Sequence, residues 1–157
     1  MEKYIQPFIS TCEKVFTDFC KTKVEPGRMF FSTKDEFEKI WDISGLIGLS
    51  GQTTGAVAIS LKDSSAIKIT EILTGKKHEP FDDIVSDAVG EIINIIAGNV
   101  KKSFEEEFRI KISLPTIIKG KAHMIIWPEK KTRIICIPFT IFENEKMCLS
   151  VAMDINV

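Results

Sequence analysis

Two polar side chains near the middle of the longest helical segment have types and a spacing that could do chemistry. Glu91 and Asn94 are three residues apart in a stretch that is otherwise rich in isoleucine, valine and alanine. Residues at positions i and i+3 are neighbours on a helix surface, so a carboxylate and a carboxamide would point the same way from a rigid element. We therefore take Glu91 and Asn94 as the candidate site.

The helix that carries this pair is predicted to begin near Asp82 or Asp83 and to end near Phe104. Acidic residues at its start and Lys101 and Lys102 near its end suit the helix macrodipole. At about 100° per residue, an apolar face is expected to pack on the core: Ile84, Ala88, Ile92, Ile95 and Ile96, with Val85, Val89 and Val100 beside them. The opposite side carries a polar strip: Asp83, Asp87, Glu91, Asn94 and Gly98.

A polar strip on an amphipathic helix is usually a solvated face, which is the simpler interpretation here. Two details favour a functional one. Asn94 is a poor helix former in a helix interior, and Gly98, one turn further on, leaves the surface bare so that another molecule could approach closely. Asn99 lies within the apolar face, and we expect it to be a buried amide bonded to backbone.

The other elements predict an α+β domain, in which the long central helix and further helices pack on a largely antiparallel sheet. The length of 157 residues suits a single domain over residues 1–157. A first helix is expected over 3–22, and another from Asp63 or Ser64, as its cap, to Gly75. Strands are expected at 29–31, at 46–49 and 56–61 as a hairpin around the turn 51–55, and at 110–112, 116–118, 124–127, 133–142 and 146–153. Pro138 predicts an edge position or a bulge.

Charge and composition exclude several classes of function. The chain has 21 basic and 22 acidic residues, a formal net charge of −1, so it is not expected to bind nucleic acid or a membrane surface. The uncharged stretch 43–61 is divided by glycines and polar residues and is not expected to span a bilayer. His78 and His123 lack the spacing of metal ligands, so we expect surface or structural roles for them and no metal or cofactor bound by this chain.

Four cysteines fall in apolar stretches and form no metal or redox motif: Cys12, Cys20, Cys136 and Cys148. They are expected to be small buried hydrophobic residues. Because no signal peptide precedes them, the chain is predicted to be cytoplasmic.

The pattern around the central helix resembles a known family. Asp87-x-x-x-Glu91-x-x-Asn94 is followed by Gly98-Asn99 and preceded by the segments 45–51 and 55–61 of the expected hairpin. Together these are similar to the CheC/CheX/FliY family of chemotaxis phosphatases, and most similar to its CheX branch, over nearly the whole length. CheC-type members carry two such signatures, whereas the first helix here has Glu13 followed by Phe16 where asparagine would be needed. One site per chain is therefore expected, as in CheX.

This resemblance implies hydrolysis of the phospho-aspartate on a CheY-type response regulator. Asn94 would orient the attacking water, and Glu91 would engage the lysine of the regulator's active site. The regulator would contribute the Mg²⁺ and the phosphoryl group. An acyl phosphate is already reactive, so positioning of water is the main task. The resemblance also implies a homodimer, which we expect to form through strands such as 133–142 and 146–153, because an unpaired apolar edge would be an aggregation liability.

Two alternatives stay open at this point. The chain could be a non-catalytic binding or flagellar-switch module that docks the regulator without accelerating its dephosphorylation. A small thioesterase with Glu91 as base is a weaker alternative, because the acidic strip is expected to face away from the sheet.

Overall fold

The computed structural model describes residues 2–32, 40–80, 82–126 and 132–155. Three α-helices lie among these residues: α1 (Glu2–Cys20), α2 (Asp63–Thr74) and α3 (Asp83–Phe104). The strands are β1 (Glu25–Pro26), β2 (Phe30–Ser32), β3 (Trp41–Gly51), β4 (Thr53–Leu61), β5 (Ile110–Ile112), β6 (Thr116–His123), β7 (Ile134–Ile141) and β8 (Glu145–Ile155).

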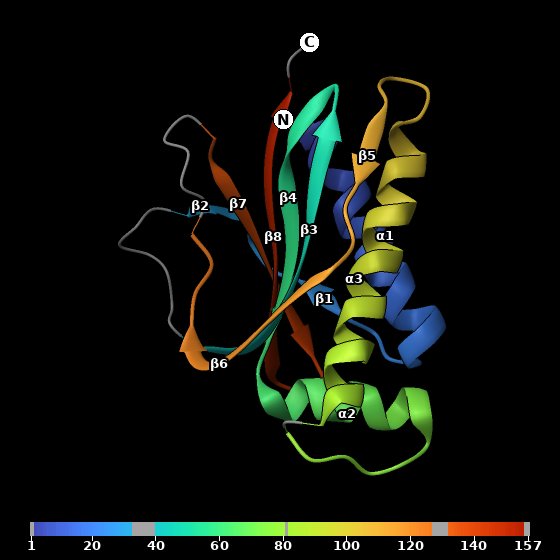
Figure 1. Ribbon diagram of the computed structural model, residues 1–157, viewed down its shortest axis with the longest axis vertical. Helices are drawn as coiled ribbons and strands as arrows, with labels where there is room; N and C mark the ends of the chain where they lie inside the picture. Colours follow the sequence, from blue (N-terminus) through green and yellow to red (C-terminus); the bar gives the residue numbers. More distant parts are fainter. Residues whose placement is uncertain (1, 33–39, 81, 127–131, 156–157) are drawn as a thin grey trace.

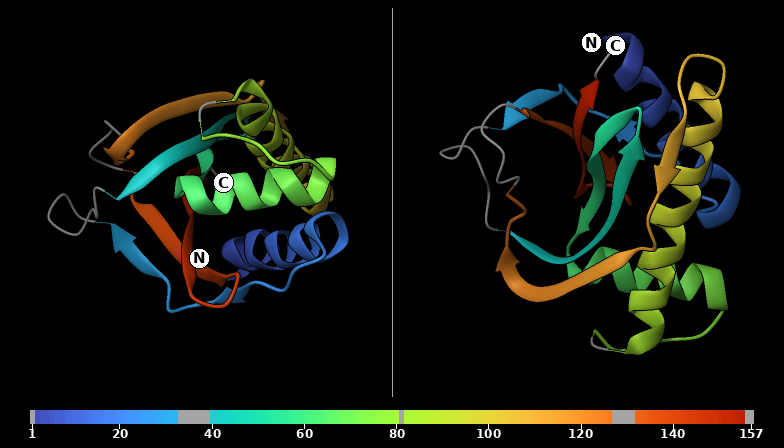
Figure 2. Two further views of the ribbon diagram at one scale, coloured as in Figure 1. Left: turned by 90° about the horizontal axis from the view of Figure 1, so that it is seen from below. Right: turned by 45° about the horizontal axis from the view of Figure 1, so that its top comes forward.

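All eight of these strands belong to one sheet in which every neighbouring pair is antiparallel. The strand order is β1-β7-β8-β4-β3-β5, while β2 also pairs with β7 and β6 also pairs with β3. The sheet is strongly curved, and the three helices lie together on one side of it (Figure 1, Figure 2). The predicted α+β architecture with a long central helix is therefore confirmed.

The β3–β4 hairpin is longer and its turn tighter than the sequence suggests. Pairing extends from Ile43 with Leu61 to Leu49 with Gly55, and β3 itself continues to Gly51. Gly51 adopts a φ of 107°, which is accessible to glycine at little cost. The predicted turn over 51–55 was wrong at its second half, because residues 53–55 belong to β4 and pair there with β8.

The segment predicted as a strand at 124–127 is not one where the structure describes it. The preceding strand, β6, is longer than expected and ends at His123, opposite Trp41 at the start of β3. Residues 124–126 pair with no strand among the described residues and lie outside regular structure, and residue 127 lies outside the described residues.

The late strands β7 and β8 are interior strands, not open edges. β8 pairs with β4 on one side and with β7 on the other, and the far side of β7 is covered by β1 and β2. Our expectation that unpaired edges of 133–142 and 146–153 await a second subunit was therefore wrong. Pro138 lies between the residues of β7 that pair with β2 and those that pair with β1. Its carbonyl accepts a hydrogen bond from the Gly27 N–H at 2.7 Å. The N–H that proline lacks therefore interrupts no strand pairing.

The two ends of α2 differ in how well the sequence predicts them. Gly75 ends the helix in the left-handed conformation with a φ of 70°, as expected, and its N–H donates to the Glu71 carbonyl. The expected N-cap at Asp63 or Ser64 was wrong: Lys62 holds that position and makes no side-chain cap. Asp42 of β3 supplies the acceptor instead, through Oδ2, 2.9 Å from the Asp63 nitrogen.

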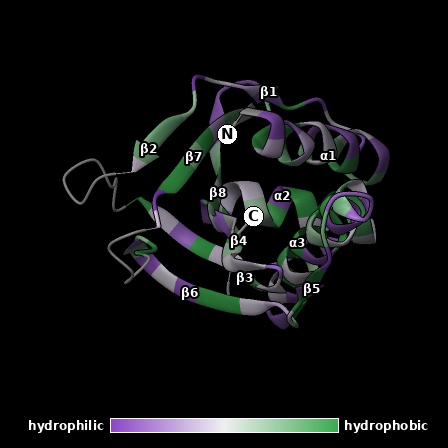
Figure 3. Cartoon of the chain, turned by 90° about the horizontal axis from the view of Figure 1, so that it is seen from above, coloured by the Kyte–Doolittle hydropathy of each residue, from purple (hydrophilic) through white to green (hydrophobic). Residues whose placement is uncertain are grey.

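The main core lies between the helices and the sheet. Tyr4 and Phe8 of α1 contact Phe104 at the end of α3, and Phe108 stacks on Phe104 with ring centroids 4.9 Å apart. This aromatic cluster holds the start of α1 against the end of α3, so the two helices run antiparallel. In the view from above, α1, α2 and α3 line one side of the sheet, and β6 at its far end shows alternating hydrophilic and hydrophobic bands (Figure 3).

All four cysteines are buried and none forms a disulfide. The expectation of small buried apolar side chains is confirmed. Burial raises the pKa of the Cys20 thiol to about 11, and it also raises the pKa of Cys12. Because the thiolate is the nucleophilic form, this burial disfavours reaction of the two side chains at neutral pH.

Candidate functional site

The orientation of α3 is set by a close approach to the sheet at Gly45. A Cβ atom there would lie 3.0 Å from Ile93 Cγ2 and 3.2 Å from Val89 Cγ1, so a glycine lets the helix pack directly on β3. The residues buried on this side include Val85, Val89, Ile92, Ile93, Ile96 and Val100. The helix is thus fixed about its own axis by its contact with β3.

This buried face is shifted from the one that we predicted. Ile93 is fully buried, whereas Ile84 is 41% exposed and Ile95 is only half-buried. The physical reason is that β5 and β6 also flank α3, with Ile117 Cδ1 and Pro115 Cγ lying 3.5 and 3.7 Å from the position of a Cβ on Gly90. Burial therefore extends toward Gly90 and away from Ile84.

Glu91 and Asn94 lie on the side of α3 that faces away from the sheet. Both side chains are exposed, as are those of Asp83 and Asp87 on the same strip. Neither Glu91 nor Asn94 forms a hydrogen bond or an ion pair with another of the residues that the structure describes. The pair is therefore adjacent on a rigid helix, open to a visiting molecule and not engaged elsewhere in the described fold.

Gly98 and Asn99 behave differently from each other. A Cβ atom on Gly98 would meet nothing within 4 Å, so no contact within the described chain explains the glycine. Asn99 is half-buried, and the prediction of a buried amide was wrong, because its position lies at the border of the shifted face. Its backbone carbonyl accepts a bond from Ser103 Oγ at 3.1 Å.

A second site on α1 is excluded by burial. Phe16, which occupies the position where a second signature would need asparagine, has no exposed surface and belongs to the main core. The expected single site per chain is consistent with this packing, since the Glu13 side of α1 does not present a free polar pair.

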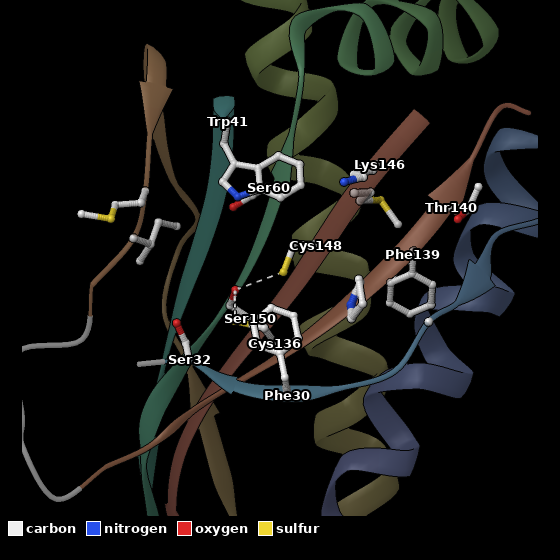
Figure 4. A pocket seen from close by; sticks show the side chains of 15 residues that line it. Phe30, Ser32, Trp41, Ser60, Cys136, Phe139, Thr140, Lys146, Cys148 and Ser150 are labelled. Carbon is white, nitrogen blue, oxygen red and sulfur yellow. Dashed lines mark hydrogen bonds between the residues drawn. The ribbon is translucent and has the colours of Figure 1, made fainter. Parts of the chain in front are cut away.

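A pocket of about 310 Å³ opens on the other face of the sheet, away from the helices (Figure 4). Trp41 lies over it and packs on a small second cluster of buried residues: Ile134, Cys136, Cys148 and Ala152. Neither Glu91 nor Asn94 lines this pocket. The candidate site is thus an exposed helix face outside this pocket, which suits a protein ligand better than a small molecule, since small-molecule sites are concave.

A series of hydrogen-bonded side chains beside this pocket was not predicted from the sequence. Ser44 Oγ lies 2.7 Å from both Ser60 Oγ and His123 Nε2, and His123 Nδ1 lies 2.6 Å from the Gly120 carbonyl. The carbonyl can only accept, so Nδ1 donates and Nε2 accepts from Ser44. Ser44 and Ser60 lie within apolar stretches of β3 and β4, which hinted at polar contacts, but the link to His123 joins residues 79 apart. The prediction of a structural histidine is confirmed for His123.

His78 has a comparable local role. Its Nε2 lies 2.7 Å from Thr74 Oγ1, at the end of α2. Among the described residues no cluster of three or more histidine, cysteine, aspartate or glutamate side chains has a geometry that could hold a metal ion. No helix in that same part of the chain is long and apolar enough to cross a membrane.

Comparison with known proteins finds relatives of this chain that cover the central helix α3. Residues 43–140 match the model of the chemotaxis phosphatase CheX family, a range that contains most of β3, all of β4 to β6, α2 and α3, and nearly all of β7. A curated relative, the CheY-P phosphatase CheX of Thermotoga maritima, is 24% identical over 132 residues, which are 83% of each chain.

Solved structures agree with the family match. The chemotaxis protein CheX from Vibrio vulnificus superposes with a TM-score of 0.88 at 25% identity, covering 97% of this chain and 99% of that one. The CheX of a complex with CheY, BeF₃ and Mg²⁺ from Borrelia burgdorferi has the same fold, with a TM-score of 0.79 at 24% identity, covering 96% of this chain and 97% of that one. The family model spans well over half of the sequence and includes the exposed Glu91–Asn94 pair, and the chain belongs to the CheX family of chemotaxis phosphatases.

Proposed function

We propose that this protein dephosphorylates the phospho-aspartate of a CheY-type response regulator, with Asn94 and Glu91 as the residues that carry the activity. The observation on which the proposal rests is the exposure of both side chains, side by side and without partners in the described chain, on the outer face of α3. The relative from Thermotoga maritima is named for this activity on CheY-P, and the Borrelia burgdorferi relative is named as a complex with CheY.

The amide of Asn94 has the chemistry to orient an attacking water. It offers both a donor and an acceptor, so it can hold one water molecule without being charged itself. The water oxygen attacks the phosphorus in line with the scissile bond. The bond from phosphorus to the aspartate oxygen breaks, and inorganic phosphate and a free carboxylate remain. Most of the rate enhancement comes from holding the water in this position, since the acyl phosphate is already reactive.

Glu91 has the chemistry to hold the regulator in a defined position on α3. As a carboxylate one helical turn before Asn94, it can pair with the cationic side chain of a lysine beside the phosphorylated aspartate. Such a charge-assisted contact is directional and places the phosphoryl group over Asn94. The Mg²⁺ that neutralises the phosphoryl oxygens is proposed to be held by the regulator, not by this chain.

The test is a single-turnover assay with a phosphorylated CheY-type receiver domain in Mg²⁺ and an excess of this protein. We expect the wild-type protein to accelerate loss of phosphate, and Asn94→Ala to reduce the saturating rate by about 100-fold while binding of the receiver changes little. Asp87→Asn, on the same exposed strip but one turn away, is the matched control and should stay close to wild type. A near-normal rate in the Asn94→Ala protein would refute the assigned role.

The same assay separates the alternatives. If saturating wild-type protein binds the phosphorylated receiver and its decay rate is unchanged, the protein is a docking module only. Turnover of an acyl-thioester would favour the thioesterase, although an exposed Glu91 on the far side of α3 from the sheet lacks the enclosed site that such a base would need.

We also propose that the protein acts as a homodimer, as the resemblance to CheX implies. Pairing through β7 or β8 is excluded by their partners within the chain, so any intersubunit strand pairing has to use another edge. Among the described strands, β6 has β3 on one side and no strand on the other. Sedimentation at the dimer mass is expected, and sedimentation at the monomer mass across micromolar concentrations would contradict the proposal.

A further inference from the structure

The most exposed large apolar side chain in the described structure lies beside the candidate site. Leu114, between β5 and β6, is 86% exposed, whereas no other large hydrophobic residue described exceeds 49%. Single exposed apolar residues are common on protein surfaces and need no explanation by themselves. The position of Leu114 and the rigidity of its backbone set it apart.

The backbone that carries Leu114 is held by three hydrogen bonds. Ser113 N donates to the Gly48 carbonyl at 3.0 Å, and Gly48 N donates to Ser113 Oγ at 2.8 Å. The Ser113 hydroxyl in turn donates to the Leu114 carbonyl at 2.8 Å. The segment is also tied to β3 on both sides, because β5 and β6 each pair with that strand. Leu114 is therefore displayed on a fixed backbone, and burying it against a partner costs little ordering entropy.

The connection from β5 to β6 brings the backbone of Leu114 next to the middle of α3, because the following residue, Pro115, packs at Gly90. The segment from β5 to β6 runs down beside the helix from its carboxyl end (Figure 1), and Pro115 reaches the level of Gly90, with its Cγ 3.7 Å from the position of a Cβ there. Leu114 precedes Pro115 and so lies nearer the carboxyl end of α3. Asn94 follows Gly90 by one helical turn on the same side.

Two exposed apolar residues belong to this region of the surface. Leu114 is part of the connection that flanks α3 on the Gly90 side. Ile84, which is 41% exposed, lies two turns before Glu91 and close to its side of the helix. Gly98 leaves the helix bare beyond the pair. A partner that covers Asn94 and extends over the Gly90 flank of α3 would also meet Leu114.

Electrostatics alone would not favour such a partner. The exposed strip carries three carboxylates, on Asp83, Asp87 and Glu91, and α3 has no basic residue before Lys101. A phosphorylated receiver site is itself anionic, so apart from one pairing to Glu91 the approach is repulsive. Affinity must come from another source, and the described residues offer one in apolar burial beside the site.

We propose that Leu114 is an apolar anchor for the receiver domain, inserted into an apolar patch beside its phosphorylation site. This inference rests on the proposed function and assigns Leu114 to binding, not to the chemical step. It predicts a partner that presents an apolar surface within reach of its phospho-aspartate.

The test compares Leu114→Ala with Phe31→Ala in the single-turnover assay and in binding of a beryllofluoride-activated receiver. Phe31 is a matched control because it is 41% exposed on β2, at the opposite end of the sheet order from β5 and β6. Burial of a leucine side chain corresponds to roughly a tenfold change in affinity or more. We expect Leu114→Ala to raise both the half-saturating concentration and Kd roughly tenfold, with the saturating rate within twofold of wild type, and Phe31→Ala to change neither.

The outcomes for Leu114 and for the proposed function are distinguishable. Asn94→Ala should give the reverse pattern, a lower saturating rate with Kd preserved. If Asn94→Ala behaves so and Leu114→Ala matches wild type in Kd, the anchor is refuted and the phosphatase stands. If the wild-type protein leaves the decay rate unchanged, the phosphatase fails, and a Leu114→Ala defect in receiver binding would still support the anchor. Since Leu114 contributes little to the core, melting temperatures should be unchanged.

Discussion

Helices α1 and α3 pack side by side on the same face of the sheet and run in opposite directions. They differ in whether two side chains at i, i+3 spacing are exposed or buried. On α3, Glu91 and Asn94 are both exposed to solvent. On α1, Glu13 is half-buried and Phe16, three residues later, is entirely inside the core. The i, i+3 spacing therefore guarantees that two side chains are neighbours, but not that they face a partner.

The difference follows from where the apolar residues lie around each helix. On α1 the buried residues Cys12, Val15 and Phe16 form the inner stripe, and the position equivalent to Asn94 falls within it. On α3 the inner stripe is centred on Val89 and Ile96, and Asn94 falls on the opposite side. A site on a helix is created by the phase of its apolar stripe as much as by its polar residues.

The strongest test of this comparison is to introduce the Glu-x-x-Asn pattern of α3 into α1. Phe16→Asn places an asparagine three residues after Glu13, but we expect no second site and a loss of about 4 kcal/mol in the free energy of unfolding, because a large core side chain is removed and an amide is buried. Urea denaturation followed by circular dichroism measures the loss. A stable variant with twice the phosphatase rate per chain would show that the two helices are equivalent after all.

A smaller effect is expected from removing the charged member of the α3 pair. Glu91→Ala should weaken receiver binding roughly tenfold, the value of one lost charge-assisted contact, and should also lower the saturating rate because the phosphoryl group is less well placed. Titrations at low and high salt provide the check, since screening should weaken binding by the wild-type protein more than by the variant. Asp87→Asn is the control for loss of a carboxylate from the strip. Equal salt dependence in Glu91→Ala and wild type would argue against a pairing at Glu91.

The smallest effect is expected at Gly98, where an added Cβ would contact no other residue of the described chain. Gly98→Ala should stabilise the protein by about 1 kcal/mol, because glycine is a poor helix former and the added methyl group meets nothing. Thermal unfolding should shift upward by about 2–4 °C. If the bare surface serves a docked receiver, the half-saturating concentration rises at the same time. A more stable variant with unchanged kinetics would remove Gly98 from the docking surface and leave the pair itself untouched.

The extent to which the sequence predicts the site differs from one residue to the next. The bounds of α3 and the exposure of Glu91 and Asn94 follow from a 22-residue amphipathic pattern with strong end signals, and the structure agrees with them. The predictions for Ile84 and Asn99 failed because both lie at the border of the apolar face. Which side of that border is buried depends on the neighbours, here Pro115 and Ile117, and not on the helix itself.

The strands show the same limit. Alternation and short apolar runs located β3, β4, β5, β7 and β8, but strand lengths depend on where a partner begins and ends. β6 stops opposite Trp41, and the strand expected at 124–127 does not form in the part that is described, 124–126. The cap of α2 by Asp42 and the chain from Ser60 through Ser44 to His123 join residues that are distant in sequence. No local pattern signals such contacts.

The amino-acid sequence alone specified the amphipathic helix, the adjacency of a carboxylate and an amide upon it, and the α+β class, because these depend on periodicity and on short-range geometry. Only the folded molecule decided the rotation of α3 on Gly45, the burial of Phe16, the interior position of β7 and β8, and the exposure of Leu114 on the segment that flanks α3. These features arise where separate elements compete for the same buried surface, and that competition is resolved only when the whole sheet and its three helices are packed together.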